Sequence, residues 1–552
     1  IAGTTGNPLR LEGTHNMTNQ SQSAQAPIMD ALLRYREAGR ASFHVPGHKN
    51  GQLYRQEEIA RLLQDVMSID VTEISGMDDL HHPEDMILEA QQLAADCFGA
   101  EESFFLVGGS TAGNLALILT VCSQPGDILL VQRNVHKSVL HGLMLAGARA
   151  VFLEPYIDPI SQLASAPVDS TIRSALAAYP EAKGVLITVP NYYGMGLDIT
   201  AIAEICHEAG VPLLVDEAHG AHYGLHPQLP ASALASGADG VVQSTHKMLS
   251  AMTMGAMLHI QGEWIDRELL RQRLAMLQSS SPSYPIMASL DLARRYVHIH
   301  REQAFREGME AIRVFREGWA GLTRFRLLGP AEVNSTPPIP QLGEASKAEV
   351  QESESILDSN PGYSTQDPFK VVICDRYGVW SGYELQEKLE QQGCIPEMST
   401  ERYVVLLFTL ASVKEDAVRL LQTLEYLEKE STILLSADVL SEGLHKDNHE
   451  VSTWNNLRAL NYSQPVQFHL QPPKKDQVET VSLELCDGRV AAEVVIPYPP
   501  GIPLLYPGET IQADIVERLM KLQSTGAKCQ GVADPSMRTI RVYRDRITSI
   551  DA

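Results

Sequence analysis

The amino-acid sequence predicts an α/β protein whose large domain contains a mostly parallel, seven-stranded sheet with helices on both faces. Short β-rich runs alternate with longer segments, such as 199–209, whose apolar residues recur at helical spacing. Such alternation is typical of parallel sheets covered on both sides. The predicted strands are residues 103–107, 128–131, 150–153, 184–189, 212–215, 240–242 and 255–260.

Polar and glycine residues concentrate directly after these strands. Ligands of open α/β sheets bind at the carboxyl ends of the strands, so these segments are where we expect the chemistry. They read GGSTAGN from residue 108, NVHKS from 134, PNYYG from 190, DEAHG from 216 and STHK from 244.

The rest of the chain predicts further domains, because 552 residues exceed what one hydrophobic core usually supports. We expect a long helical stretch over 287–315, followed by a small unit with strands 370–374 and 403–409 and a helix over 414–427. The last unit is expected to be helical from about 436 and then β-rich at 479–485, 490–496 and 539–543. The predicted divisions are an appended or misassigned leader (1–16, before Met17), an N-terminal arm and linker (17–85), the large domain (86–315), a small α/β domain (316–430) with an acidic, Pro- and Ser-rich insertion (329–367), and a C-terminal α+β domain (431–552).

Composition excludes several classes of function. The chain is 44% hydrophobic and 20% charged, and it has no apolar run long enough to span a membrane. A formal net charge of -24 disfavours a nucleic-acid partner and favours cationic small molecules. Seven scattered cysteines without a C-x-x-C pair indicate a reducing cytoplasm.

The glycine-rich segment 108–114 has the layout of an anion site. It follows a strand and opens an apolar helix, so its glycines let the backbone approach a phosphate while helix amides and the Ser110 and Thr111 hydroxyls donate hydrogen bonds. The alternative is an ordinary glycine turn in which a hydroxyl caps the helix.

Asp216 ends a buried apolar strand, where an unpaired carboxylate is costly. A pyridinium nitrogen would be a suitable partner, because an adjacent carboxylate keeps the ring protonated and the protonated ring accepts electrons. Capping of a following helix by Asp216 is the alternative.

Lys247 lies among apolar residues at the next strand end, where burial would lower its pKa and make its amine a nucleophile for Schiff-base formation. Ser244 and His246 beside it are further donors for a phosphate, and His136 is placed to set its imidazole against an aromatic ring. Taken singly, Lys247 is more often a surface charge and His136 a loop or cap residue. Together these residues predict pyridoxal 5'-phosphate (PLP).

A metal site is the rival interpretation. His219, His222 and His226 with Asp216 have a spacing that suits zinc or iron in a hydrolase. That interpretation leaves the phosphate-type loop and the STHK segment unexplained, so we predict no metal.

The ordered set Ser110, Thr111, His136, Asp216, His219, Ser244, His246 and Lys247 resembles the fold-type I PLP decarboxylases of the ornithine/lysine/arginine group, in particular its short biosynthetic branch of bacterial arginine decarboxylases. The resemblance extends to FHVPGHK at 43–49, DVTE at 70–73, GMDDLH at 76–81, SSSPSY at 279–284, PYPPGIP at 497–503 and PGE at 507–509.

The resemblance implies a role for each residue. Lys247 would carry the cofactor as a Schiff base, Asp216 would pair with the pyridine nitrogen, and His136 would stack on the ring. Ser110, Thr111, Ser244 and His246 would hold the phosphate. It also implies a homodimer with active sites at the interface, where Ser280 would reach the partner's phosphate, although this chain has serines at 279–280 where the group usually has threonines.

The expected reaction is decarboxylation of a basic amino acid, first arginine to agmatine in polyamine synthesis, with lysine and ornithine as alternatives. Lys247 or His219 would reprotonate the α-carbon, and Glu509 would be an active-site acid from the C-terminal domain or a carboxylate satisfied by turn amides. Asp70, Glu73, Asp78, Asp79 and Glu509 are the acidic residues considered for the distal cation of the substrate. An aminotransferase, which needs an arginine for the α-carboxylate, and a non-catalytic PLP-fold protein are more distant alternatives.

Overall fold

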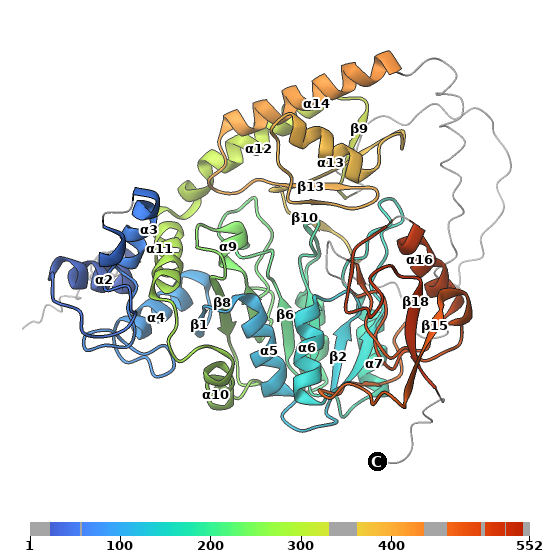
Figure 1. Cartoon of the computed structure of the whole chain (residues 1–552), viewed down its shortest axis with the longest axis horizontal. Helices are drawn as coiled ribbons and strands as arrows, with labels where there is room; N and C mark the ends of the chain where they lie inside the picture. Colours follow the sequence, from blue (N-terminus) through green and yellow to red (C-terminus); the bar gives the residue numbers. More distant parts are fainter. Residues whose placement is uncertain are drawn as a thin grey trace, which may run out of the picture.

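The computed structural model describes residues 23–55, 58–330, 362–434, 461–497, 503–524 and 526–544. Its centre is one sheet in the order β1-β8-β7-β6-β4-β2-β3-β14 (Figure 1). Seven strands come from the large domain, and each agrees with a predicted strand to within two residues. They are β1 (Glu102–Leu106), β2 (Ile128–Gln132), β3 (Arg149–Leu153), β4 (Val185–Thr188), β6 (Leu213–Asp216), β7 (Gly240–Gln243) and β8 (Ala256–Ile260).

The sheet is mostly parallel, as predicted. Strands β3, β2, β4, β6 and β7 run parallel, whereas β8 is antiparallel to both β7 and β1. The short strand β14 (Val466–Gln467), from the C-terminal part of the chain, adds an eighth, antiparallel strand beside β3. In register, Thr188 lies beside Asp216 and Asp216 beside Val242, so the polar segments after these strands emerge at one edge.

Helices cover both faces because successive strand residues point to opposite sides. Leu129 and Val131 of β2 pack in a core with α5 (Gly109–Val121) and α6 (Lys137–Ala146). Their neighbours Ile128 and Leu130 pack in a second core with α7 (Asp169–Ala178) and α8 (Thr200–Glu208). Burial of each such side chain contributes roughly 1.5–3 kcal/mol to the stability of the fold. Because a shift of one residue would turn these side chains to the other face, their burial fixes the strand register and hence the position of the strand ends.

The predicted helical stretch over 287–315 is confirmed as helical, but it is divided into two α-helices. The chain forms α11 (Tyr284–His300), a 3-10 turn η3 (Arg301–Phe305) and α12 (Arg306–Trp319). The backbone of Arg301 has a φ of 47°, which an α-helix does not accommodate.

The small domain lies above the large sheet in Figure 1 and contains the predicted strands and closing helix. Its antiparallel sheet has the order β12-β13-β11-β9. The pair β10 (Thr365–Gln366) and β5 (Met195–Gly196) joins this region to the large domain. Residues 331–361 of the predicted insertion lie outside the described residues. The elements are β9 (Phe325–Leu327), β11 (Lys370–Asp375), α13 (Gly382–Gln391), β12 (Met398–Ser399), β13 (Val404–Leu407) and α14 (Lys414–Leu434).

The C-terminal region pairs β15 with β18 and β16 with β17, and α16 packs beside them. The predicted strand 490–496 is wrong in extent, because Val490, Ala491 and Val495 make only isolated bridges before β16 begins. The predicted helical start near 436 and residues 498–502 lie outside the described residues. The elements are β15 (Val478–Ser482), η4 (Leu483–Leu485), β16 (Ile496–Pro497), α16 (Ala513–Ser524), β17 (Cys529–Gln530) and β18 (Thr539–Tyr543).

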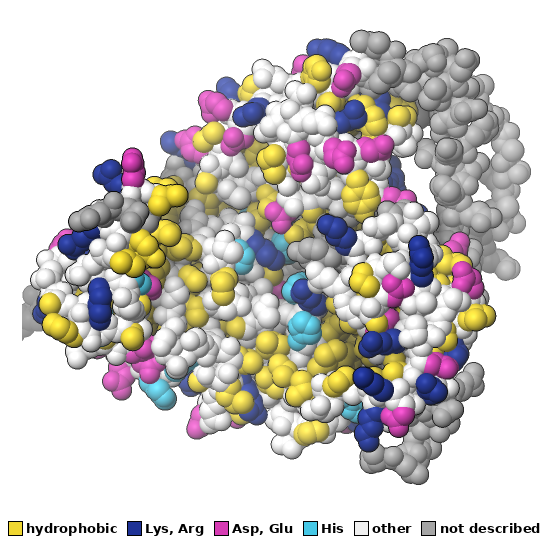
Figure 2. Space-filling model, in the orientation of Figure 1, with side chains coloured by type: hydrophobic (Ala, Val, Ile, Leu, Met, Phe, Trp, Pro, Cys, Tyr) yellow, Lys and Arg dark blue, Asp and Glu magenta, His cyan; other side chains and the backbone are white. Residues whose placement is uncertain are grey.

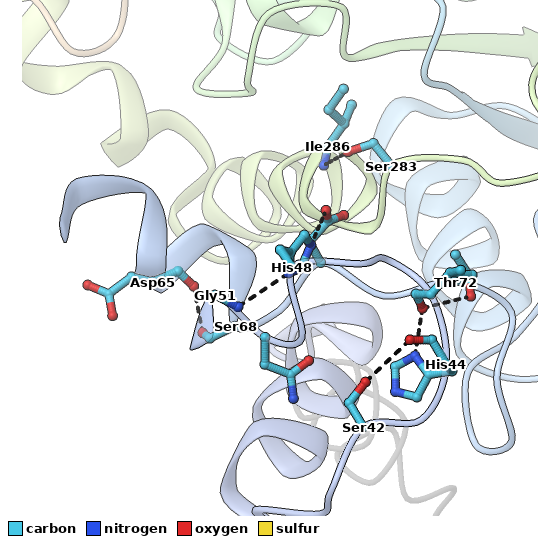
Figure 3. A network of polar contacts seen from close by, with 12 residues as sticks. Ser42, His44, His48, Gly51, Asp65, Ser68, Thr72, Ser283 and Ile286 are labelled. Atoms are coloured by element: carbon cyan, nitrogen blue, oxygen red, sulfur yellow. Dashed lines mark hydrogen bonds and ion pairs between the residues drawn. The ribbon is translucent and has the colours of Figure 1, made fainter. Parts of the chain in front are cut away.

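The N-terminal arm contains the FHVPGHK motif in an ordered network of polar contacts (Figure 3). The Gly51 amide donates to Nδ1 of His48, which leaves Nε2–H of His48 to donate to the Asp70 carboxylate at 3.1 Å. This hydrogen bond links the FHVPGHK motif to the DVTE motif, which begins at Asp70. The arm's helical elements are α2 (Pro27–Glu37), η1 (Gln52–Tyr54), η2 (Glu58–Ala60) and α3 (Arg61–Met67), followed by α4 (Met86–Phe98) of the large domain.

Within the described ranges, no helix combines the length and the apolar character that crossing a bilayer requires. All seven cysteines are free thiols. The predicted leader, 1–16, lies outside the described residues.

Candidate active site

Three basic side chains meet where the large and small domains adjoin. Lys247 lies in the one-turn helix α9 (Thr245–Met248) after β7, and its Nζ is 3.1 Å from Nε2 of His219 in the loop after β6. The other ring nitrogen, Nδ1 of His219, is 3.1 Å from Nζ of Lys370 at the start of β11. His219 and Lys370 are buried, and Lys247 is partly exposed. In Figure 2, histidine and basic side chains gather near the centre of the visible face, below the small domain.

Burial makes this cluster less basic than the same groups in water. It lowers the pKa of Lys247, and the Asp216 and Glu397 carboxylates raise it in part. It lowers the pKa of Lys370 to about 8, against the opposing effect of Asp367. Burial, with the charges of Lys370 and Lys247, holds the pKa of His219 well below its usual value, so the imidazole is neutral.

Asp216 and His136 are joined by a second buried network. The Asn114 amide donates to the Asp216 carboxylate at 2.9 Å and to the Ser138 hydroxyl at 3.0 Å. The Ser138 backbone N–H donates to Nδ1 of His136, so His136 is the N-cap of α6 and its proton is on Nε2. The cap alternative for His136 is thus confirmed. No helix follows Asp216 directly; its carboxylate accepts from the Ala218 amide of a turn.

The hydroxyls predicted to bind phosphate are not used as helix caps. Gly108 is the N-cap of α5 and makes no side-chain cap, and neither Ser110 nor Thr111 makes a side-chain hydrogen bond within the described residues. The Ser244 Oγ is buried without a partner in that same part of the chain. His246 donates from Nδ1 to the Gly255 carbonyl at 2.9 Å, which leaves Nε2 for a ligand.

These features fit PLP. A buried hydroxyl without a partner at Ser244 is costly unless a ligand supplies one. The Asp216 carboxylate, 3% exposed, forms no ion pair with a protein cation in the described ranges, which suits a pyridinium partner. The amine of Lys247 with its lowered pKa suits Schiff-base formation.

The metal alternative is wrong for the described residues, in which no group of three His, Cys, Asp or Glu side chains could hold an ion. The three histidines have separate partners. His219 lies between the two lysines, Nε2 of His222 is 3.1 Å from the buried Asp367 carboxylate, and Nδ1 of His226 accepts from the Gln228 amide.

Glu509 and Ser280 are not brought to Lys247 within the described part of one chain. Glu509 forms an ion pair with Arg133, 2.6 Å between Oε1 and Nη1, and accepts from the Tyr506 turn amide. Ser280 is exposed beside Ser279, whose carbonyl contacts His81 of the arm.

The acidic residues considered for the distal cation have other partners or lie at the surface. Asp78 accepts four backbone N–H groups at the start of α4, from Asp79, Glu84, Asp85 and Ile87. Asp70 pairs with His48, Asp79 accepts from the His81 amide, and Glu73 is exposed.

Sequence reasoning missed Lys370, Asn114 and Glu397. Asn114 belongs to the GGSTAGN segment, and its place one turn into a buried helix was a usable signal. Lys370 was a lysine within an apolar strand, which is a rare position for that residue. Glu397 accepts a hydrogen bond from the Tyr192 hydroxyl at 2.8 Å, and no sequence pattern marks it.

A lysine of lowered pKa and a buried aspartate after neighbouring strands of a mostly parallel sheet are typical of the class of fold-type I PLP-dependent enzymes. The family can be stated more closely. Residues 26–416 match the major domain of the Orn/Lys/Arg decarboxylases, and 464–535 match their C-terminal domain. The chain therefore belongs to the Orn/Lys/Arg decarboxylase family, and it is a PLP-dependent amino-acid decarboxylase.

Related proteins can be aligned with this chain over nearly its whole length. The uncharacterized protein YaaO of Bacillus subtilis is 40% identical over 94% of this chain and 98% of that protein. An arginine decarboxylase of the same organism is 31% identical over 95% of this chain and 98% of its own length. The structure of the Escherichia coli constitutive lysine decarboxylase has a TM-score of 0.71 at 23% identity, covering 96% of this chain and 84% of that one, and supports the fold.

Proposed function

We propose that this enzyme decarboxylates arginine to agmatine and carbon dioxide for polyamine synthesis, with PLP held on Lys247. The observation that carries the choice of substrate is the similarity to arginine decarboxylases of B. subtilis and Bacillus anthracis, 31% and 30% identical, each matched over 98% of its length. Lysine is the second candidate, because the constitutive lysine decarboxylase of E. coli is 26% identical over 78% of its length. Ornithine is the third.

Different residues of the site would bind different parts of PLP. Asp216, oriented by Asn114, would hold the ring nitrogen, and the His136 imidazole, held by the Ser138 backbone N–H, would stack on the ring. Ser110 and Thr111 at the start of α5, with Ser244 and His246, would hold the phosphate. When bound, PLP supplies an aldehyde that captures an amine and a protonated ring that accepts the electrons released as carbon dioxide leaves.

The protein residues must then orient the substrate and move protons. With PLP bound, the substrate amine would take the place of the Lys247 amine, which would then be available to carry a proton to the α-carbon, with His219 in hydrogen-bond contact. No arginine forms a hydrogen bond or ion pair with Lys247, His219 or Asp216 in the described ranges, which favours a reaction that releases the α-carboxylate over transamination. Burial excludes water from His219 and strengthens these interactions.

The proposal includes a homodimer in the cytoplasm. Ser280 is exposed on the side of the molecule that carries the arm, and the His81 contact links the two segments. A second copy seated there would bring Ser280 to the partner's phosphate. Seven free thiols suit a reducing compartment.

A carbon-dioxide release assay with arginine, lysine and ornithine in parallel tests the proposal, with the amine product identified by mass. We expect release from arginine above the other two, and none above background for Lys247→Ala. The purified wild type should be yellow, and borohydride should remove the colour and label Lys247. Release from lysine or ornithine alone would reassign the substrate, whereas no release from any of them would refute the decarboxylase assignment and a colourless protein would refute PLP.

A further inference from the structure

The contacts of His219 impose a condition on its two lysine neighbours. A neutral imidazole has one N–H donor and one acceptor nitrogen, whereas a charged lysine can only donate. Both ring nitrogens of His219 lie 3.1 Å from a lysine Nζ. One lysine must therefore accept the imidazole N–H, and only a neutral amine can accept. In the neutral-imidazole state, Lys247 and Lys370 cannot both be charged.

Lys370 is held in this position by the surrounding fold. Its side chain is 1% exposed, and burial of a lysine is costly unless its amine has partners. Its Cβ and Cγ lie against Gly194 of the PNYYG segment, where an added Cβ would be 2.7 and 2.6 Å from these atoms. Its backbone N–H donates to the Asp367 carbonyl, and its Nζ lies 5.7 Å from the centre of the Tyr192 ring. The glycine thus leaves the space through which Lys370 reaches His219.

We propose that Lys370 is a positioning residue that exchanges a proton with Lys247 through His219. This inference rests on the proposed function, because Lys247 is the group that would need the proton during turnover. The enzyme would use the exchange to recharge Lys247 after the lysine has been set free as a neutral amine.

The transfer conserves protons. A charged Lys370 gives a proton to Nδ1 of His219, and the proton on Nε2 passes to the lone pair of Lys247. Lys370 ends as a neutral amine that accepts from Nδ1–H, and Lys247 ends as an ammonium that donates to Nε2. Each state satisfies both contacts of the imidazole. Lys247 would give this proton to the α-carbon, and solvent water would then reprotonate the partly exposed Lys247. The reverse exchange through His219 would return a proton to Lys370, so each turnover takes one proton from solvent.

Neighbouring charges act on all three groups of the cluster. Asp367 and Glu397 raise the pKa of Lys370, and the charge of Lys247 lowers it. Asp216 and Glu397 raise the pKa of Lys247. Lys370, Lys247, His136 and His246 all lower the pKa of His219. Since burial brings the pKa of Lys370 to about 8, the donor proton is present below that pH and is lost above it.

The test compares the Lys370→Met, Lys370→Arg and His219→Gln holoenzymes with the wild-type holoenzyme. The matched control is Lys388→Met, which removes a lysine from α13 of the small domain, away from His219. Methionine fills the space without a charge, and arginine keeps the charge but does not release a proton at neutral pH. We expect kcat to fall by about 10²-fold in all three variants, with KM within about threefold of wild type, because proton transfer by one group is typically of this size. The control should match wild type.

Two further readouts separate a relay from a structural role. The double variant Lys370→Met/His219→Gln should lose no more than either single variant, since the two residues act as one unit. The wild-type decline of kcat above about pH 8 should be absent in Lys370→Met. In the same variant, the pH titration of the visible absorbance of the holoenzyme should move to higher pH, because a positive neighbour has been removed.

Several outcomes would overturn the relay. Additive losses in the double variant would do so, as would full activity in Lys370→Arg, which would show that the charge alone is needed. A rise in KM at constant kcat would show that Lys370 binds the substrate carboxylate instead. If the wild type released no carbon dioxide from any of the basic amino acids, the proposed function would fail, and an unshifted absorbance titration in Lys370→Met would then also refute the relay.

Discussion

Asp216 is 3% exposed, and among the described residues its carboxylate accepts hydrogen bonds from one side-chain amide and one turn amide. A buried carboxylate with so few donors depends on each of them. Asn114 has a second role, because its amide also bonds Ser138, which bonds His136. One residue thus orients both groups expected to touch the cofactor ring.

We therefore expect Asn114→Ala to weaken PLP binding by about tenfold or more, since a hydrogen bond to a charged group is worth roughly 1.5–3 kcal/mol. The measurement is an absorbance titration of cofactor-free enzyme with PLP. Thr120→Ala is the control, because Thr120 lies in the same helix, is buried, and its hydroxyl donates only to the Ala116 carbonyl within the part of the chain that the structure describes. Equal affinity in wild type and Asn114→Ala would show that Asp216 holds its orientation without the amide.

The site was predictable where a residue's role follows from its position in one strand-helix unit. Asp216 and Lys247 end buried strands, and the sheet brings those ends together. Lys370 could not be placed in the same way, because it reaches His219 from the other domain, 151 positions along the chain. The metal hypothesis failed for a related reason: His222 and His226 follow His219 closely, but the turns direct them to Asp367 and to the Gln228 amide.

At the scale of elements, the strands were predictable because each is a short buried run with clear ends. The break between α11 and α12 was not, because Arg301 adopts its positive φ with neither glycine nor proline to mark it. The contact that places α12 is long-range in sequence. The Cα of Gly308 approaches the backbone after β13 so closely that an added Cβ would be 2.2 Å from the Thr409 carbonyl oxygen.

Gly308→Ala should therefore move α12 away from the small domain and destabilise the protein by about 1–3 kcal/mol, the usual cost of overpacking. Thermal unfolding should show a lower midpoint, by roughly 2–4 °C for each kcal/mol. Gly321→Ala is the matched control, since its added Cβ would meet only the Gly318 carbonyl at an ordinary 3.5 Å. An unchanged midpoint for Gly308→Ala would mean that the helix can shift at no cost.

At the scale of the whole molecule, the N-terminal arm exposes an unusual amount of apolar surface. The side chains of Phe43, Ile59 and Leu62 are 94%, 93% and 88% exposed. Figure 2 shows the hydrophobic cluster over this part of the molecule, at the left. Contiguous apolar surface of this kind marks an interaction site more often than a solvated face. Another part of the arm, at His81, contacts the Ser279 carbonyl next to the exposed Ser280.

If two copies pair through the arm, Leu62→Asp should shift the enzyme from dimer to monomer in sedimentation velocity, because it places a charge in an apolar interface. Activity and PLP retention should fall with it, since each site would lose the Ser280 of the partner subunit. Leu485→Asp, on a 70% exposed leucine of the C-terminal region, should leave the dimer intact. A Leu62→Asp enzyme that remains dimeric and active would place the interface elsewhere. A monomer with full activity would separate assembly from catalysis and leave Ser280 without the role that the resemblance implies.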